Sequence, residues 1–118
     1  MKKLLIIDDD KGVLEMAGSH FRSQGFEVLC AGTANEGLRL AFKDRPHAIL
    51  LDYNLDEYTG EDVLERVKKC LPGSKVLMVT GALDPALERR LLALGADAFL
   101  LKGSSIISIQ RKVEELTG

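Results

Sequence analysis

Apolar residues along the chain follow two alternating patterns, which are short continuous runs and longer stretches with helical spacing. Continuous runs predict strands that are covered on both faces, as in a parallel sheet. They cover residues 4–7, 26–31, 48–51, 75–80 and 98–101. Between the runs, apolar residues recur every three or four positions, so a helix is predicted after each strand.

The predicted helices have clear boundary signals. Glu36 follows Thr33 at the spacing of a capping box, and Pro85 follows Asp84 as expected at a first helical position. The predicted N-caps are Asp10, Thr33, Asp84 and either Ser104 or Ser105. The predicted inward-facing residues are Val13, Ala17 and Phe21, then Leu38, Ala41 and Phe42, then Val63, Leu64, Val67 and Cys70, then Leu87, Leu91 and Leu94, and last Ile106, Ile109, Val113 and Leu116.

Five repeats of strand then helix predict an α/β fold. In such a fold, helices cover both faces of a parallel sheet and right-handed crossovers join the strands. A length of 118 residues is that of one domain, so we expect a single domain over residues 1–118.

Composition indicates a soluble globular protein, with 29% charged and 46% hydrophobic residues. Sixteen basic against eighteen acidic residues, without a basic block, do not indicate nucleic-acid binding. Asp8, Asp9 and Asp10 end the first apolar run too early for a secretory signal, so we expect a cytoplasmic protein without membrane contact. Cys30 and Cys70 have no metal-ligand spacing and are interpreted as small core residues.

The chain's most informative stretch is 48–52, in which four apolar residues end on Asp52. A carboxylate at the carboxyl edge of a parallel sheet is tethered to rigid structure where such sheets bind ligands. Asp is also a common turn former, so this stretch alone leaves open whether Asp52 is reactive or begins a turn.

The predicted topology brings other polar residues to the same edge. Asp8 and Asp9 follow the first strand, Thr80 closes the fourth, and Lys102 follows the fifth. Because the carboxyl ends of parallel strands share one edge, these side chains are predicted to converge with Asp52. Each residue also has an ordinary structural explanation, as a helix cap, a strand residue or a solvated charge. We favour a shared site because four strands end on chemical groups that can act together.

The predicted cluster has an excess of negative charge. Three carboxylates near one lysine require a proton or a cation, and hard oxygen ligands without His or Cys point to Mg2+. A metal with open water positions beside an ammonium group suits a phosphoryl group. Asp52 would then be the nucleophile, as carboxylates are in aspartyl-phosphate chemistry.

These motifs resemble those of the receiver domain of two-component response regulators, over residues 4–116. The resemblance is carried by Ile6 to Asp10, by Leu50-Leu51-Asp52 with Gly60 eight residues on, by Val79-Thr80, and by Ala98 to Lys102. It implies a flavodoxin-like three-layer α/β/α sandwich, with five helices and a parallel sheet of order 2-1-3-4-5, an arrangement that a member of this family illustrates.

The resemblance also implies roles for individual residues. Asp52 is expected to accept phosphoryl from a phosphohistidine of a histidine kinase or phosphotransfer protein. Asp9, Asp52 and the Asn54 backbone carbonyl are expected to bind Mg2+ directly, and Asp8 through a water. Lys102 is expected to pair with a phosphoryl oxygen. The resemblance thus implies a phosphoacceptor switch, not an enzyme, that assists its own phosphorylation and dephosphorylation.

The implied switch involves Thr80 and Phe99. The Thr80 hydroxyl turns toward the phosphoryl group, Phe99 swings inward, and the face of the fourth helix, fifth strand and fifth helix changes shape. That face is expected to bind a downstream effector or partner, and homodimerisation is left open. Asn54 and Ala82 flank the route of an attacking water in this family, so they are candidates for setting the lifetime of the phosphoryl group.

The chain departs from the family pattern at three positions. Asp56 and Gly103 replace prolines, and Gly81 replaces an alanine. The family's peptide after the lysine is usually cis, and because a non-proline cis peptide costs about 2.5–4 kcal/mol, Lys102-Gly103 is expected to be trans. The departures at Asp56 and Gly103 keep open a second hypothesis, a degenerate receiver that docks partners without phosphorylation.

A small aspartyl-phosphate phosphatase is the third hypothesis. Such enzymes need a second acid two residues after the nucleophile, and Asn54 at that position cannot transfer protons. Outside the site, Leu92 and Ile107 are expected to be exposed. His20 and His47 are interpreted as structural or surface residues.

Overall fold

The computed structural model describes residues 1–55, 59–82 and 84–118, and it confirms the predicted alternation of strands and helices. The strands are β1 (Lys3–Ile7), β2 (Glu27–Ala31), β3 (Ala48–Asp52), β4 (Lys75–Thr80) and β5 (Ala98–Leu101). The helices are α1 (Lys11–Ser23), α2 (Ala34–Asp44), α3 (Gly60–Cys70), α4 (Pro85–Ala93) and α5 (Ile106–Thr117). All strand pairs are parallel, and the sheet has the predicted order β2-β1-β3-β4-β5.

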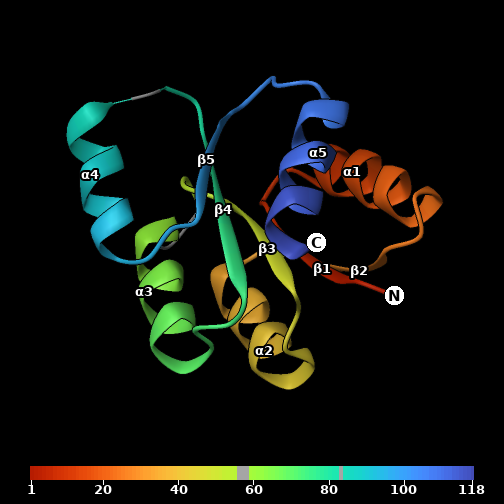
Figure 1. Cartoon of the computed structure of the whole chain (residues 1–118), viewed down its shortest axis with the longest axis horizontal. Helices are drawn as coiled ribbons and strands as arrows, with labels where there is room; N and C mark the ends of the chain where they lie inside the picture. The colour runs from red at the N-terminus through yellow and green to blue at the C-terminus, as the bar shows by residue number, and fades with distance from the viewer. Residues whose placement is uncertain (56–58, 83) are drawn as a thin grey trace.

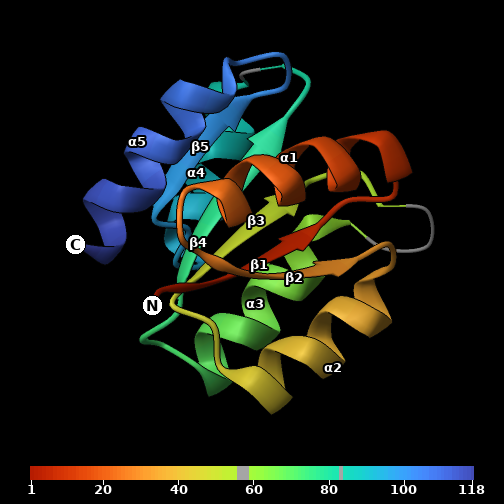
Figure 2. The same ribbon diagram turned by 90° about the vertical axis from the view of Figure 1, so that its right-hand side faces the viewer.

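Helices cover both faces of the sheet (Figures 1 and 2). The sheet therefore separates two hydrophobic cores, one on each face. Side chains alternate between the faces along each strand. Leu5 and Ile7 of β1 therefore face α2 and α3, whereas Leu4 and Ile6 face α1 and α5. Leu91 joins α4 to the first of these cores. The result is a three-layer arrangement in which every strand carries apolar residues on both sides.

Side-chain caps begin most of the helices. The Asp10 carboxylate accepts the backbone N–H groups of Gly12 and Val13, and Asp84 similarly caps α4. Ser105, not Ser104, caps α5. The capping box of α2 is only half formed. Thr33 accepts the Glu36 N–H, but the Glu36 carboxylate pairs with Arg39 instead of returning to the N-cap.

Two residues assigned to the core are exposed, so these predictions were wrong. Phe42 is exposed because the buried line of α2 consists of small residues that let the helix lie close to the sheet, and Phe42 falls outside that line. Those residues are Ala34, Gly37 and Ala41. Cys70 is exposed because it is the last residue of α3, and the following Leu71 packs on the core instead.

Strand register decides which residues reach the carboxyl edge. Ile7 lies beside Leu51, and Thr80 lies beside Leu101, so β1, β3, β4 and β5 end close to one level. Asp52 proved to be the last residue of β3 and not the first residue beyond it. Within the described ranges, no helix is both long and apolar enough to cross a membrane.

Candidate functional site

Backbone hydrogen bonds extend the sheet past its strand ends and hold the candidate residues in place. The Asp8 N–H donates to the Ala31 carbonyl at 3.0 Å, and the Lys102 N–H donates to the Thr80 carbonyl at 2.8 Å. The peptide after Asp52 is fixed in the same way on the neighbouring strand β4. Asp8, Asp52, Thr80 and Lys102 are therefore attached to rigid backbone although they lie at the rim.

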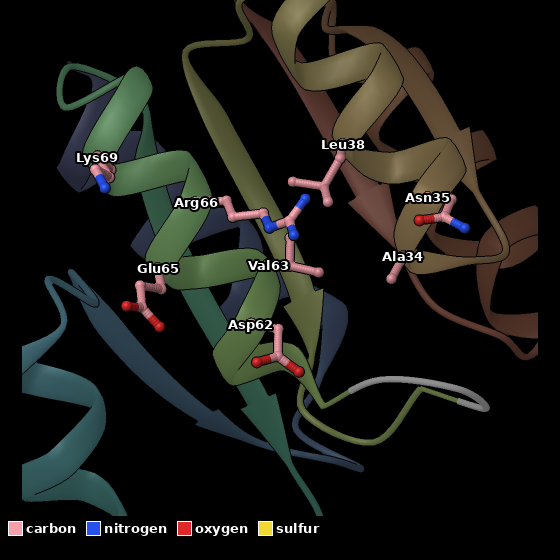
Figure 3. A pocket seen from close by; sticks show the side chains of 8 residues that line it. All are labelled: Ala34, Asn35, Leu38, Asp62, Val63, Glu65, Arg66 and Lys69. Carbon is pink, nitrogen blue, oxygen red and sulfur yellow. The ribbon is translucent and has the colours of Figure 1, made fainter.

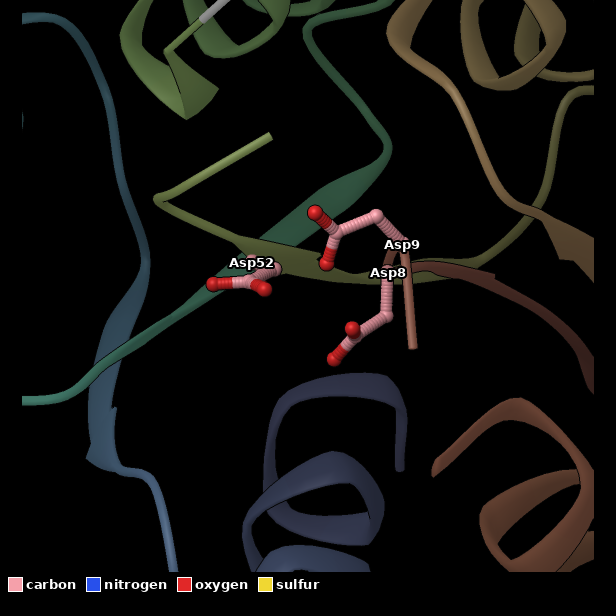
Figure 4. Close-up of side chains that lie close together, drawn as sticks. All are labelled: Asp8, Asp9 and Asp52. Atoms are coloured by element: carbon pink, nitrogen blue, oxygen red, sulfur yellow. The ribbon is translucent and has the colours of Figure 1, made fainter. Parts of the chain in front are cut away.

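Three carboxylates converge at this edge, as predicted (Figure 4). One oxygen from each of Asp8, Asp9 and Asp52 lies within 4.8 Å of the other two. Asp52 and Asp8 are buried, with 1% and 6% of their surfaces exposed, whereas Asp9 is exposed. The cluster therefore combines closely spaced negative charge with one side that is open to solvent.

Lys102 supplies the positive charge of the site. Its Nζ lies 2.9 Å from Oδ2 of Asp52, whose side chain is fully buried, while 44% of the lysine side chain is exposed. The other oxygen, Oδ1, accepts the backbone N–H of Asn54 at 3.1 Å. Among the described residues, Oδ2 has no partner at hydrogen-bonding angles, so its contact with Lys102 is an ion pair rather than a well-directed hydrogen bond.

Crowding of charge shifts the pKa values of two groups. Burial raises the pKa of the Asp8 carboxyl, and the nearby Asp52 and Asp9 carboxylates add to this effect. The Asp10 N–H, which donates to Asp8 Oδ1 at 2.9 Å, and the Lys102 ammonium oppose it. The pKa of Lys102 is raised, chiefly by its contact with the Asp52 carboxylate. The site thus favours additional positive charge.

These residues fit a hard divalent cation. Carboxylate oxygens are the ligands that Mg2+ prefers, and the buried Oδ2 of Asp52 still lacks a directed partner. No His or Cys belongs to the cluster, which argues against a softer metal. Asn54 lies beside the cluster through its N–H contact with Asp52, and a metal-binding role for its carbonyl stays a prediction.

The two predicted switch residues lie next to each other, on neighbouring strands. Thr80 is buried, and its hydroxyl donates to the Ala82 carbonyl at 3.1 Å, so it is turned toward the following loop. Phe99 is half-buried and lines a small hollow with Thr80 and Leu91. The structure therefore brings both side chains together in an arrangement in which the Thr80 hydroxyl is not bonded to Asp52.

Gly60 is required at this site by close packing. A Cβ atom at position 60 would lie 2.8 Å from the Asp52 carbonyl oxygen, closer than real Cβ atoms approach backbone. The Gly60 N–H also donates to the Tyr53 carbonyl at 2.6 Å. The glycine eight residues after Asp52 thus lets α3 begin directly against the end of β3.

The departures from the family pattern have different outcomes. No cis peptide occurs among residues 1–55, 59–82 and 84–118, so Lys102-Gly103 is trans as expected. Gly103 has φ +90°, a conformation that glycine adopts readily and proline cannot. Asp56 lies outside the described residues. Gly81 is exposed, and a Cβ atom there would meet nothing within 4 Å.

Sequence reasoning missed a polar cluster beside the site. Arg90 of α4 contacts Glu61 of α3 and the hydroxyl of Tyr53, the residue after Asp52. These residues lie 29 and 37 positions from Arg90, and no local pattern links them. His20 and His47 are structural or surface residues, as predicted, since His20 bonds to Gln110 and the exposed His47 accepts the Lys3 N–H. Leu92 and Ile107 are exposed, as predicted.

A hollow of about 420 Å3 lies between α2 and α3 (Figure 3). Asp8, Asp9 and Asp52 do not line it. Leu38 and Val63 form apolar parts of its wall, and the Arg66 side chain extends across it. None of the predicted site residues lines this hollow. The hollow is not the candidate functional site, because the converging carboxylates lie at the carboxyl edge of the sheet.

Comparisons with known proteins agree with this architecture. Residues 4–114 match the family described as the response regulator receiver domain. The probable transcriptional regulatory protein TcrX of Mycobacterium tuberculosis is 30% identical over 115 residues, which are 96% of this chain and 48% of that protein. The chain thus spans about half the length of this curated relative.

Solved structures show the same fold. A CheY-like response regulator receiver domain protein from Methanospirillum hungatei has a TM-score of 0.90 and 32% identity, covering 98% of this chain and 96% of that one. The chemotaxis protein CheY4 of Vibrio cholerae has a TM-score of 0.93 and 25% identity, covering 98% of both chains. These similarities confirm the predicted flavodoxin-like fold.

Proposed function

The chain belongs to the response regulator receiver domain family, and from this premise we propose that Asp52 is its phosphoacceptor. The observation that carries the proposal is the buried Asp52 carboxylate, which is 2.9 Å from the Lys102 amine and close to the Asp8 and Asp9 carboxylates. A purely structural turn residue has no need of such neighbours. Receiver domains are signalling switches, and their expected phosphoryl donors are histidine kinases or phosphotransfer proteins.

Receiver domains bind Mg2+ at an acidic pocket, and Asp8, Asp9 and Asp52 form that pocket here. We propose that Asp9, Asp52 and the Asn54 carbonyl bind the ion directly and that Asp8 acts through a water. When bound, Mg2+ offsets the negative charge that accumulates as phosphoryl approaches the carboxylates. Support comes from the cluster's excess of carboxylates over lysine and from the undirected Oδ2 of Asp52.

In the proposed reaction, an Asp52 carboxylate oxygen attacks the phosphorus atom of a phosphohistidine. The new O–P bond forms as the P–N bond breaks, and the imidazole leaves with the electron pair of that bond. Lys102 is proposed to pair with a phosphoryl oxygen. In the unmodified protein its contact with Asp52 already holds the amine beside the carboxylate that would carry the phosphoryl group. The chain's own part in dephosphorylation would pass through water reaching the acyl phosphate beside Asn54 and Ala82.

Phosphorylation is proposed to act on partner binding through Thr80. Its hydroxyl must leave the Ala82 carbonyl to reach the phosphoryl group, and the hollow beside Phe99 lies next to this path. The face of α4, β5 and α5 would change shape and alter the binding of an effector. Preference for the active form by a few kcal/mol is enough for such a switch.

The proposal is tested by incubating the protein with Mg2+ and a small acyl-phosphate donor and measuring its intact mass. We expect the wild type to gain one phosphoryl group that is sensitive to hydroxylamine, and Asp52→Asn to gain none. Asp62→Asn is the matched control, because Asp62 is an exposed acid of α3 outside the cluster.

Two other results would change the assignment. Absence of an adduct in the wild type, with the fold intact, would support a docking module that works without phosphorylation. Continuous turnover of a phosphoester substrate would support the phosphatase hypothesis. An adduct that persists in Asp52→Asn would place the phosphoacceptor elsewhere.

A further inference from the structure

Helices α4 and α5 each have a single buried residue, whereas α1, α2 and α3 have three or four. Helix α4 comprises nine residues, of which only Leu91 is buried, and Leu92 beside it is 52% exposed. By contrast, α3 buries Gly60, Val63, Leu64 and Val67. A helix with so little apolar anchorage depends more strongly on its polar contacts for its position.

Arg90 makes polar contacts that join α4 to α3 and to Tyr53. Its Nε–H donates to Glu61 Oε1 at 2.8 Å, and an Nη2–H reaches the Tyr53 hydroxyl at 3.5 Å. The Glu61 side chain is 28% exposed and that of Arg90 is 55% exposed. One guanidinium group therefore bridges α4, the first turn of α3 and the residue after Asp52.

Both partners of Arg90 are held firmly next to Asp52. The Tyr53 N–H donates to the Val79 carbonyl at 2.9 Å, and its carbonyl accepts the Gly60 N–H at 2.6 Å. Glu61 directly follows Gly60, which packs against the Asp52 carbonyl. The bridge thus ends on two side chains whose backbone is packed beside the candidate phosphoacceptor.

The bridge occurs together with the outward position of Thr80. In this structure the Thr80 hydroxyl bonds to the Ala82 carbonyl, two residues before the Asp84 cap of α4. The Thr80 hydroxyl would have to leave the Ala82 carbonyl to reach Asp52. A contact that holds α4 in its present place therefore opposes that movement.

We infer that Arg90 is a positioning residue whose bridge to Glu61 and Tyr53 stabilises the unphosphorylated arrangement of α4 and so restrains the switch. This inference rests on the proposed function, because it names a regulation of the same site. Since the bridge favours only one arrangement, removing it shifts the population toward the other. Exposed ion pairs have small effects, so the expected change is about two- to fivefold.

The test uses the whole chain with Arg90→Gln, Glu61→Gln, the double variant and Tyr53→Phe. Arg89→Gln is the matched control, since Arg89 is an exposed neighbour on the same helix and forms no ion pair within the described part of the chain. Hydrogen exchange of the α4 amides, followed by mass spectrometry, reports the stability of the helix. Titration with beryllium fluoride and Mg2+ reports the apparent affinity for a phosphoryl analogue.

We expect Arg90→Gln and Glu61→Gln each to speed α4 exchange and to tighten beryllofluoride binding by about two- to fivefold. The double variant should resemble either single variant, because both remove the same contact. Tyr53→Phe should have a smaller effect, given the longer distance, and Arg89→Gln should match the wild type.

The inference fails if Arg90→Gln and Arg89→Gln give the same α4 exchange, or if the effects of Arg90→Gln and Glu61→Gln add in the double variant. In either case the wild type would still bind beryllofluoride and the proposed function would stand. A wild type that forms no adduct and binds no beryllofluoride overturns the proposed function, and with it the coupling of Arg90 to Asp52.

Discussion

Two lysine–aspartate pairs lie at opposite edges of the sheet and have opposite surroundings. At the amino edge, Lys68 Nζ lies 2.7 Å from Asp97 Oδ2 and donates to the Ser74 carbonyl at 2.8 Å. The same Asp97 oxygen accepts the Val76 N–H at 2.8 Å. At the carboxyl edge, Lys102 meets a fully buried Asp52 whose Oδ2 has no directed hydrogen bond among the described residues.

The contrast separates a stabilising pair from one that we propose to be reactive. Lys68 and Asp97 are 13% and 21% exposed, their charges balance, and both also contact backbone, so little remains for a ligand to satisfy. The Asp52 pair has two further carboxylates beside it and a half-exposed lysine. Unbalanced charge costs stability in the free protein and is offset when a cation or phosphoryl group binds.

Magnesium should act on the carboxyl edge alone and is expected to have the largest effect. At a concentration about 100 times its Kd, a ligand that binds only the folded state stabilises it by about 2.7 kcal/mol. Thermal or urea unfolding with and without Mg2+ measures this. Asp52→Asn and Asp8→Asn should lose most of the stabilisation, whereas Asp97→Asn should retain it. An equal response in all four proteins would contradict the metal site.

Removing the amino-edge lysine should destabilise the protein without affecting the site. Lys68→Met keeps the packing of the stem but leaves Asp97 and the Ser74 carbonyl without their charged donor, at a cost of about 2 kcal/mol. Urea unfolding measures the loss, and Lys69→Met is the control because Lys69 is exposed one residue along the helix. Phosphoryl uptake by folded Lys68→Met should equal that of the wild type. A loss of uptake would contradict the view that the Lys68–Asp97 pair supports stability and not the site.

Neutralising one acid of the carboxyl edge should stabilise the metal-free protein. Asp8→Asn keeps an oxygen that can accept the Asp10 N–H and removes one charge from the cluster. The expected gain is about 1 kcal/mol, the repulsion of two unit charges about 4 Å apart in water. Urea unfolding in a chelator measures it, with Asp10→Asn as the control outside the cluster. A destabilised Asp8→Asn would mean that the acids do not repel one another significantly.

The stability gained by Asp8→Asn should depend on pH. Because the pKa of Asp8 is raised in the folded protein, chiefly by burial, the folded state keeps a proton at pH values where the unfolded chain has lost it. The wild type therefore carries a penalty at neutral pH that fades as the pH falls through the raised pKa toward the ordinary value of 3.8. The advantage of Asp8→Asn should shrink over the same window, and an advantage that grows in acid would have the wrong sign.

Local patterns predicted the elements well and the details of packing poorly. Continuous apolar runs and caps such as Asp10 and Asp84 identified five strands and five helices, because burial on both faces and unpaired helix N–H groups leave local signals. Phe42 and Cys70 were misplaced, since their exposure depends on how a helix is rotated and where it ends on the sheet. Helical spacing does not contain that information.

The convergence of the candidate site was predicted because its residues close strands that are neighbours in the sheet. Asp8, Asp52, Thr80 and Lys102 could be assigned to one edge once the sheet was taken to be parallel. The Arg90 bridge was not predicted, since its partners belong to other elements and follow no period. The contacts of Lys68 and Asp97 were not predicted either, because they involve backbone groups of Ser74 and Val76 near the start of β4.

By itself the sequence determined which residues form strands and helices and which reactive side chains stand at the strand ends, since these depend on neighbours along the chain. Only the tertiary structure decided that Oδ2 of Asp52 is buried against Lys102 and that Thr80 is turned toward Ala82. It likewise decided that Arg90 joins α4 to Glu61 and Tyr53. The physical reason is that burial, charge balance and hydrogen-bond direction depend on groups distant in sequence, whose positions follow from strand order and helix packing.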